Sequence, residues 1–563
     1  MGTENVVAPA TARQSWLSSA HLGRIVALVS IVLAFGLNLR TATELGLDRR
    51  PSSWTAAWIP AALSDLYYGG PGNYTGLVSV RDAFEQRTTG PDSYNEAIRR
   101  TLAELPRSAA GSETHLLGTD DKGSLDFAKL AFRLFGPNVE ALLYTYFALM
   151  GLSALLFIVR FWRQPWTLLL LAAFLVAHDA MLAVVPINPQ LVGLLVARSI
   201  TVVATIAFLH VILEMGCWWI GRAHWSGAIP TLGQVALIIF TVHISSRAAW
   251  QILAATLIGA LLALLTVPRL RQTVWRYVPW PSTANGRARA AWLPLLALWP
   301  VVALWTGNVS LALYRQATYA PAYFEDQGAT HVFWHSLFSG LSTHPDLARE
   351  HRLLIDDVSV VAATGRYLVA EGRRDEWVAI GGESPGFSKI RYGPYDRYSG
   401  EAFRALCLRE FAACAATFAY YKPLVLGQYL LWFTGWRAEI PGPYMYDREL
   451  FEQYQPMARA MRDEGKIVDL GRPARLTLTI LVGVALAGTL RANVRPLVLM
   501  LVVLVGGASL PSMVAYPIAH TISDALVAAA TGFYAVLALL VALAVSWIGR
   551  LVGLPRRPEP TPT

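Results

Sequence analysis

The sequence predicts a mainly α-helical, polytopic membrane protein with about ten transmembrane helices and two soluble segments outside the cytoplasm. Of its 563 residues, 54% are hydrophobic and only 15% are charged, whereas soluble globular proteins carry about 25% charged residues. Several apolar runs reach the roughly 20 residues that a helix needs to cross a bilayer. The net charge is +9, and the arginines cluster at the ends of the apolar runs, which indicates membrane topology rather than nucleic-acid binding.

Apolar runs and polar stretches alternate along the chain. Residues 1–21 form a cytoplasmic N-terminus, and the run at 22–38 is predicted to be an uncleaved transmembrane helix because no small-residue cleavage site follows it. Residues 39–138 contain no run long enough to span, so they are predicted to form an extracytoplasmic loop with interfacial helices. The remaining predicted parts are transmembrane helices 2–7 (139–312), an extracytoplasmic domain (313–473), transmembrane helices 8–10 (474–548) and a cytoplasmic tail (549–563). The ten predicted spans are 22–38, 139–159, 165–185, 191–215, 229–246, 250–267, 292–312, 474–490, 496–513 and 521–548.

The basic residues of the short loops indicate the orientation. With the N-terminus in the cytoplasm, nearly all of these residues fall in inside loops, as the positive-inside rule requires. Both termini are then cytoplasmic and both large polar segments lie outside, so we expect a multi-pass protein of the bacterial inner membrane. ATP and nucleotide sugars are not available on that outer side. The inside loops include 160–164, 221–227 and 491–496, and the outside loops are 186–190, 245–247 and 515–520.

The stretch GTDDKGSLDFAKLAFRLFG, residues 118–136, predicts a short amphipathic helix before the second span. At helical spacing it has one polar and one apolar face, and it is too short to cross a membrane, so it is predicted to lie in the interface plane with its apolar side down. Gly136-Pro137 ends it. The polar face carries Asp126, Lys129 and Arg133, and the apolar face carries Leu125, Ala128, Phe132 and Phe135.

Asp120, Asp121 and Lys122 precede this helix and are expected at its N-terminus, at the outer headgroup level. Free N–H groups at a helix N-terminus favour anions, and Lys122 adds positive charge, so a phosphate could dock there. The carboxylates could act as a general base, or hold a metal together with the phosphate. The alternative is a capped, solvated loop.

The pattern DKGSLDFAKLAFRLFG resembles the first-loop segment of membrane glycosyltransferases of the C superfamily (GT-C). In the mannosyltransferase-like and aminoarabinose-transferase-like branches this segment reads roughly Asp-His-Pro-Pro-Leu, then an apolar helix, then Leu-Phe-Gly. Asp121 matches the Asp, Leu125 the Leu, and residues 134–136 the ending, whereas residues 122–124 depart from His-Pro-Pro. The order of transmembrane spans and outer segments along the chain is also similar to that of the family. The family's catalytic carboxylate usually lies just after the first span, where this chain has Glu44 and Asp48.

The resemblance implies a lipid-linked sugar transferase that acts on the outer leaflet. Its partners would be a polyprenyl-phosphate sugar donor and membrane lipids, with no nucleic acid. No cofactor is predicted with certainty, and a divalent cation is optional. Asp121 or Asp120 would deprotonate an acceptor hydroxyl. Lys122, Arg198 and Arg247 would neutralise the departing phosphate.

A second polar and aromatic cluster lies in residues 329–357. We assign His331, Trp334, His335 and Asp357 to binding of the acceptor or sugar, because aromatic faces stack on sugar rings and His both donates and accepts hydrogen bonds. His331 and His335 share a helical face, but no HExxH glutamate lies between them, and no metal site is predicted. Alternatives are a packed histidine face and, for the aspartate, a helix cap.

Within the predicted spans, Asp179 and Arg198 reach the same depth of an antiparallel hairpin and are predicted to pair. The pair is either structural or serves to place Arg198 against the donor phosphate. Cys217 lies in a predicted span. Cys407 and Cys414 are seven residues apart, roughly 10 Å along one helix and too far to bridge, so all three cysteines are predicted to be buried free thiols.

Two other functions fit the sequence. A transporter or flippase for lipid-linked envelope glycans is one, although no clear internal repeat supports it. A scaffold of an envelope-assembly complex is the other.

Overall fold

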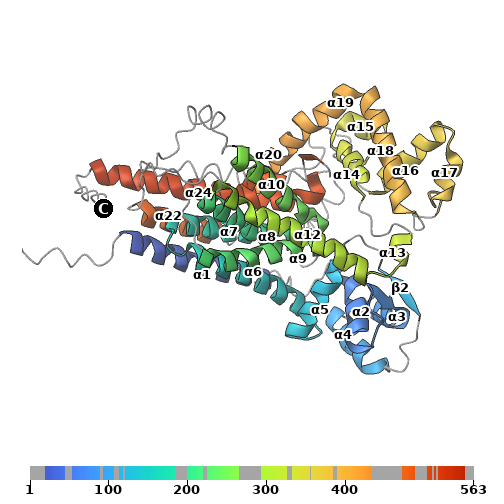
Figure 1. Cartoon of the computed structure of the whole chain (residues 1–563), viewed down its shortest axis with the longest axis horizontal. Helices are drawn as coiled ribbons and strands as arrows, with labels where there is room; N and C mark the ends of the chain where they lie inside the picture. Colours follow the sequence, from blue (N-terminus) through green and yellow to red (C-terminus); the bar gives the residue numbers. More distant parts are fainter. Residues whose placement is uncertain are drawn as a thin grey trace, which may run out of the picture.

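The computed structural model describes residues 19–44, 53–88, 93–106, 113–117, 121–184, 200–219, 225–264, 293–325, 332–354, 357–384, 390–433, 472–487, 504–509, 513–514 and 518–551. Within these ranges nearly all regular structure is helical, and one two-stranded sheet is present. A bundle of long helices carries two smaller groups of helices at one of its ends (Figure 1). The prediction of a mainly α-helical polytopic membrane protein is thereby confirmed.

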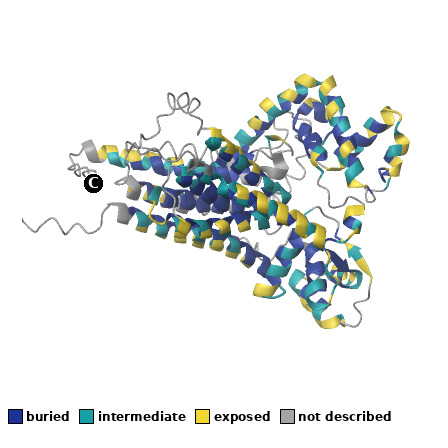
Figure 2. Cartoon of the chain, viewed as in Figure 1, coloured by how far each residue is buried: buried dark blue, intermediate teal, exposed yellow. Residues whose placement is uncertain are grey.

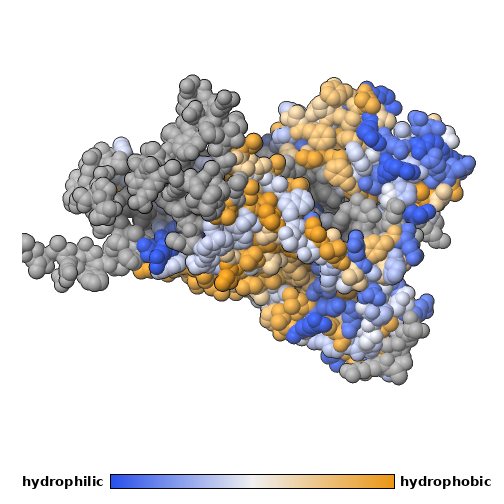
Figure 3. Space-filling model, in the orientation of Figure 1, coloured by the Kyte–Doolittle hydropathy of each residue, from blue (hydrophilic) through white to orange (hydrophobic). Residues whose placement is uncertain are grey.

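Eight helices of the described part are long and apolar enough to cross a membrane. Helices α7 and α8 form the centre of the bundle, because 89% and 83% of their apolar windows are buried, against 28% for α12 (Figure 2). Apolar side chains cover much of the visible face of the bundle (Figure 3). The eight helices are α1 (Ser19–Glu44), α6 (Glu140–Phe161), α7 (Pro165–Val184), α8 (Ile200–Trp219), α9 (Ala228–Ile244), α10 (Ala249–Leu264), α12 (Trp299–Thr318) and α24 (Ile518–Leu551).

These helices coincide with eight of the ten predicted spans. The predicted span 474–490 is helix α22 (Arg472–Ala487), whose apolar part, Arg475–Val484, is shorter than the others. The predicted span 496–513 lies mostly outside the described residues. Helix α22 packs closely on α24, where a Cβ on Gly483 would lie 2.6 Å from the backbone oxygen of Ala538. Glycine thus permits the close helix contact that stabilises membrane bundles.

A buried ion pair joins three helices inside the bundle. Asp179 on α7 accepts a hydrogen bond from Arg475 on α22 at 2.7 Å and one from the Thr41 hydroxyl on α1 at 2.6 Å. Both charged side chains are almost fully buried. The predicted partner, Arg198, lies outside the described residues. Because an ionised group inside a bundle is costly unless paired, these contacts stabilise the association of α1, α7 and α22.

The first lobe, residues 53–135, follows α1 and lies at the end of the bundle (Figure 1). The two strands pair antiparallel, with Thr75 opposite Leu116. Asn95 on α4 accepts a hydrogen bond from the backbone N–H of Val139 at 2.8 Å, which attaches the lobe to the start of α6. The elements are α2 (Ser53–Tyr67), β1 (Thr75–Leu77), α3 (Val78–Thr88), α4 (Tyr94–Glu104), β2 (Thr114–Leu116) and α5 (Gly123–Phe135).

The second lobe, residues 322–416, follows α12 and ends where the chain returns to the bundle through the π-helical turn Thr417–Tyr421 and α20 (Lys422–Phe433). Hydrophilic side chains gather over α16 and α17 (Figure 3). The elements of this lobe are α13 (Ala322–Glu325), α14 (Phe333–Gly340), η8 (Leu341–Thr343), α15 (Pro345–Glu350), α16 (Asp357–Ala370), α17 (Arg374–Ala379), α18 (Tyr392–Arg409) and α19 (Phe411–Ala416).

Candidate functional site

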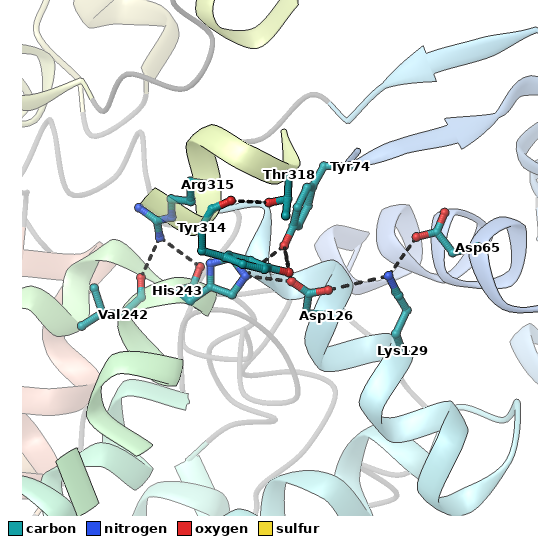
Figure 4. A network of polar contacts seen from close by, with 9 residues as sticks. All are labelled: Asp65, Tyr74, Asp126, Lys129, Val242, His243, Tyr314, Arg315 and Thr318. Carbon is teal, nitrogen blue, oxygen red and sulfur yellow. Dashed lines mark hydrogen bonds and ion pairs between the residues drawn. The ribbon is translucent and has the colours of Figure 1, made fainter. Parts of the chain in front are cut away.

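The candidate site lies where α5 meets the C-terminal end of α9, the end of α12 and the turn before β1 (Figure 4). Helix α5 ends as predicted, with the Gly136 N–H donating to the Phe132 oxygen and a positive φ of 85° at Gly136. Its start is pressed against α9, since a Cβ on Gly123 would lie 2.2 Å from the backbone oxygen of His243. Only glycine permits this approach, and it brings the polar face of α5 to the end of α9.

The apolar face of α5 packs on protein, which differs from the prediction of a face turned toward lipid. Leu125, Ala128 and Phe132 are buried in the main hydrophobic core. Leu134 and Phe135, in the last turn, are exposed. The amphipathic pattern identified the buried face, but it could not distinguish neighbouring helices from a membrane, because both present an apolar surface.

Asp126 is the centre of the polar contacts. Its Oδ2 lies 2.8 Å from Nε2 of His243, the penultimate residue of α9, and accepts a short hydrogen bond from the hydroxyl of Tyr74. The Tyr314 hydroxyl on α12 lies 3.2 Å from that of Tyr74. His243 and Tyr74 are buried, whereas Tyr314 is exposed. Two separate segments thus meet at one carboxylate, and the exposed Tyr314 is connected to it through Tyr74.

Tyr74 is held in an unusual backbone conformation. Its φ is 61°, and that of the preceding Asn73 is 55°, both in the left-handed region that disfavours ordinary side chains. The Tyr323 hydroxyl donates to the Tyr74 oxygen at 2.7 Å, and the Tyr319 ring packs on the Tyr74 ring with centroids 4.4 Å apart. Such strain persists only where surrounding contacts compensate for it, and it is common at functional sites.

The environment sets the charge state of the Asp126 and Tyr74 pair. Burial disfavours ionisation of Asp126, but the hydrogen bonds from His243 and Tyr74 outweigh it and lower the pKa of this carboxyl below its usual value. Burial, together with the negative charge of Asp126, raises the pKa of the Tyr74 hydroxyl well above its usual range. At neutral pH, Asp126 is therefore an anion and Tyr74 a neutral donor.

A second carboxylate and a lysine extend the network along α5. The Lys129 ammonium lies 2.9 Å from Oδ2 of Asp65 on α2 and 3.8 Å from Oδ1 of Asp126. Oδ1 of Asp65 is buried and has no hydrogen-bond partner within the described ranges. Lys129 therefore lies between two carboxylates, one on its own helix and one on α2.

Two arginines and Asp121 lie close to the same end of α9. Arg315 on α12 donates to the backbone oxygens of Val242 and His243, at 3.2 and 3.4 Å. Oδ1 of Asp121 accepts from the backbone N–H of Ser246 at 2.9 Å, in the short turn η6 (Ser246–Ala248) that also carries Arg247. The carboxylate of Asp121 thereby connects the start of α5 to the Arg247 turn.

The other residues predicted for the donor site are placed differently. Lys122 is buried, and its ammonium lies over the ring of Tyr323, 4.3 Å from the centroid, rather than on the surface. Asp120 and Arg198 lie outside the described residues.

Trp334 and His335 lie on α14 and Asp357 lies on α16. Both helices belong to the second lobe, apart from α5 (Figure 1). His335 is buried, with Nδ1 at 2.6 Å from the Tyr395 hydroxyl and Nε2 at 3.1 Å from Asp357. Asp357 is the first residue of α16 and is exposed. Trp334 packs on α18, with the Arg404 guanidinium 5.3 Å from its ring centroid. His331 lies outside the described residues.

In the described part of the chain, one set of three His, Cys, Asp or Glu side chains has ligand atoms within 4.8 Å of one another: Glu350, His351 and Glu410. Nε2 of His351 lies 2.6 Å from Oε1 of Glu410, and Arg409 lies 3.5 Å from the same oxygen. The arginine makes this set a poor cation site. The optional divalent cation has no ligand set around Asp126 among the described side chains.

Sequence reasoning placed Asp126 and Lys129 on one helix face and assigned Arg247 to the donor phosphate, but it did not join them. It missed Tyr74, Asp65, Tyr314 and Arg315 altogether. No short-range pattern marks these four residues, although the Tyr-rich end of the α12 segment was a compositional signal.

The fold and the site together define a polytopic helical membrane protein with a buried Asp–His–Tyr cluster at the lobe-bearing end of its bundle. Comparison with family models, curated proteins and solved structures finds no match for this chain.

Proposed function

We propose that the protein is a membrane glycosyltransferase of the GT-C kind, which transfers a sugar from a polyprenyl-phosphate donor to an acceptor hydroxyl outside the cytoplasm. The observation that carries the proposal is the contact of His243 Nε2 with the ionised Asp126 at the end of the bundle. A reaction on a lipid-borne donor needs acid–base and cationic groups at this depth.

His243 is proposed as the general base. Nε2–H donates to Asp126, which leaves Nδ1 as an acceptor, and Nδ1 is buried with no hydrogen-bond partner in the described part of the chain. An aspartate that fixes the tautomer of a histidine and stabilises its protonated form is the arrangement used for deprotonating hydroxyl groups. Asp121 and Asp120, proposed from the sequence, are the alternative assignment of this role.

The proposed step requires that the buried Nδ1 of His243 become accessible to the acceptor. The acceptor hydroxyl then loses its proton to Nδ1, and its oxygen bonds to the anomeric carbon. The bond from that carbon to the phosphate oxygen breaks, and polyprenyl phosphate leaves with the electron pair. Arg315 and Arg247 supply positive charge for this anion. Stabilising the charge that develops on the leaving group contributes more than the base.

The proposed orientation has ten spans, both termini in the cytoplasm of a bacterial cell, and both lobes outside. The arginine distribution of the short loops supports it. Fusions of alkaline phosphatase and a fluorescent protein after residues 104, 384 and 551 test it. Phosphatase activity is expected at the first two positions and fluorescence at the third, and the reverse pattern would contradict the orientation.

The activity is tested on purified protein in nanodiscs with a panel of polyprenyl-phosphate sugars, by following release of polyprenyl phosphate. We expect release from at least one donor, and a fall of about 10²–10⁴-fold in Asp126→Asn and His243→Gln. Asp82→Asn is the matched control, because Asp82 lies in the same lobe in an exposed pair with Arg81.

Each outcome of this assay bears on the proposal. Loss of turnover in Asp121→Asn, with Asp126→Asn unaffected, would move the base to Asp121. Movement of an intact lipid-linked glycan across proteoliposomes without release would favour the transporter, and neither release nor movement would favour the scaffold.

A further inference from the structure

Cys407 and Cys414 lie on either side of a helix break, which differs from the prediction that they lie along one helix. Helix α18 ends at Arg409 and α19 begins at Phe411, with Glu410 between them at φ −120° and ψ 50°. The separation of roughly 10 Å expected for residues seven apart holds only for a straight helix. It therefore does not apply here.

Glu410 holds this break in place. Its N–H donates to the Leu406 oxygen at 2.8 Å, and its oxygen accepts from the Cys414 N–H at 3.0 Å. Its carboxylate lies 2.6 Å from Nε2 of His351, which follows α15. The bend is thus fixed from both helices and from a third segment.

The two cysteines, on either side of the break, pack on one apolar cluster. Cys414 is buried in an apolar cluster with Leu341 and Leu406, and Cys407 packs against the same cluster. Interaction with the neighbouring thiol raises the pKa of Cys407 and lowers that of Cys414. The lower pKa favours a thiolate at Cys414, the reactive form in disulfide chemistry.

We propose that Cys407 and Cys414 form an intramolecular disulfide that links α18 to α19. The proposal rests on the extracytoplasmic placement of the second lobe, which belongs to the proposed function, because disulfides form and persist in such compartments. The third cysteine, Cys217, lies on α8 of the bundle and serves as the internal control.

The reaction requires a disulfide oxidant, such as a thiol–disulfide oxidoreductase of the same compartment. One cysteine thiolate attacks a sulfur of the oxidant disulfide and expels an oxidant thiolate. The second cysteine thiolate then displaces the remaining oxidant sulfur. The chain loses two electrons and two protons, and the oxidant is reduced to a dithiol.

The test uses full-length protein isolated with its free thiols blocked by N-ethylmaleimide. Trypsin cuts after Arg409, between the two cysteines, so their peptides are expected to have one combined mass that separates on reduction. In denatured but unblocked protein, we expect PEG-maleimide to add to one of the three cysteines before reduction and to all three after it. Cys407→Ser and Cys414→Ser should each abolish the linked mass.

In a separate experiment, protease added to spheroplasts reports on which side of the membrane the second lobe lies. If the lobe is cleaved from outside and three adducts form before reduction, the disulfide is overturned and the proposed orientation stands. If the lobe is protected, purified protein is treated with oxidised glutathione. Failure to link then overturns the pairing, while successful linkage supports the pairing and counts against the proposed orientation.

Discussion

Nε2 of His243 lies 2.8 Å from Oδ2 of Asp126, although the two residues are 117 positions apart in the chain. One belongs to the end of a membrane helix and the other to a short helix of the first lobe. Their contact joins the bundle to the lobe and places an oriented imidazole at the boundary between them. Four predictions test this contact and the packing that supports it.

Acidification should weaken this contact. Because the folded pKa of Asp126 is lowered from 3.8, its stabilising contribution is present above the unfolded value and is lost as the pH falls through the folded one. Wild-type protein should therefore lose thermal stability below about pH 4, and Asp126→Asn should lose less over the same interval. Thermal unfolding in nanodiscs between pH 3 and 7 measures this, and identical slopes for the two proteins would contradict it.

Adding a side chain at position 123 should separate α5 from α9. In Gly123→Ala the new Cβ would meet the backbone oxygen of His243 at 2.2 Å, so backbone must move, at a cost of about 1–3 kcal/mol or more. We expect lower stability together with loss of turnover. Gly36→Ala on α1 is the matched control, because nothing lies within 4 Å of its added Cβ. Equal behaviour of the two variants would show that the close approach is unimportant.

Removal of Lys129 should destabilise the first lobe. Asp65 has only 6% of its side chain exposed, so Lys129→Met leaves a buried carboxylate without its ion-pair partner, at a cost of about 1–3 kcal/mol. The further change Asp65→Asn should recover part of this loss, because it removes the charge. Unfolding midpoints of the two single variants and the double variant measure the coupling. Additive effects would argue against the ion pair.

The Asp179–Arg475 ion pair should likewise contribute to the stability of the helix bundle. Breaking it by Arg475→Met strands a fully buried Asp179, and such losses cost roughly 3–5 kcal/mol. Asp179→Asn added to Arg475→Met should restore part of the stability. Arg374→Gln is the control: its pair with Glu383 has exposed side chains, and such surface pairs contribute about 0–1 kcal/mol. A loss no larger than the control's would contradict the structural role.

The spans and the helix α5 were predictable because their signals are local. Apolarity over about 20 residues identifies a spanning helix, and the 3.6-residue period with Gly136-Pro137 marked both faces and the end of α5. By contrast, the pairing of Asp179 with Arg475 joins residues 296 positions apart, and Tyr74 meets His243 across 169. Nothing in the neighbourhood of any of these residues specifies its partner.

The sequence by itself determined that the protein is helical, that it crosses a membrane many times and that a helix with a polar face precedes the second span. These properties follow from the hydrophobicity and the periodicity of single segments. Only the tertiary structure decided that this face packs on α9, that Asp126 meets His243 and Tyr74, and that the helix breaks at Glu410 between Cys407 and Cys414. Those contacts depend on how helices fill space against one another, which is a property of the whole packed chain.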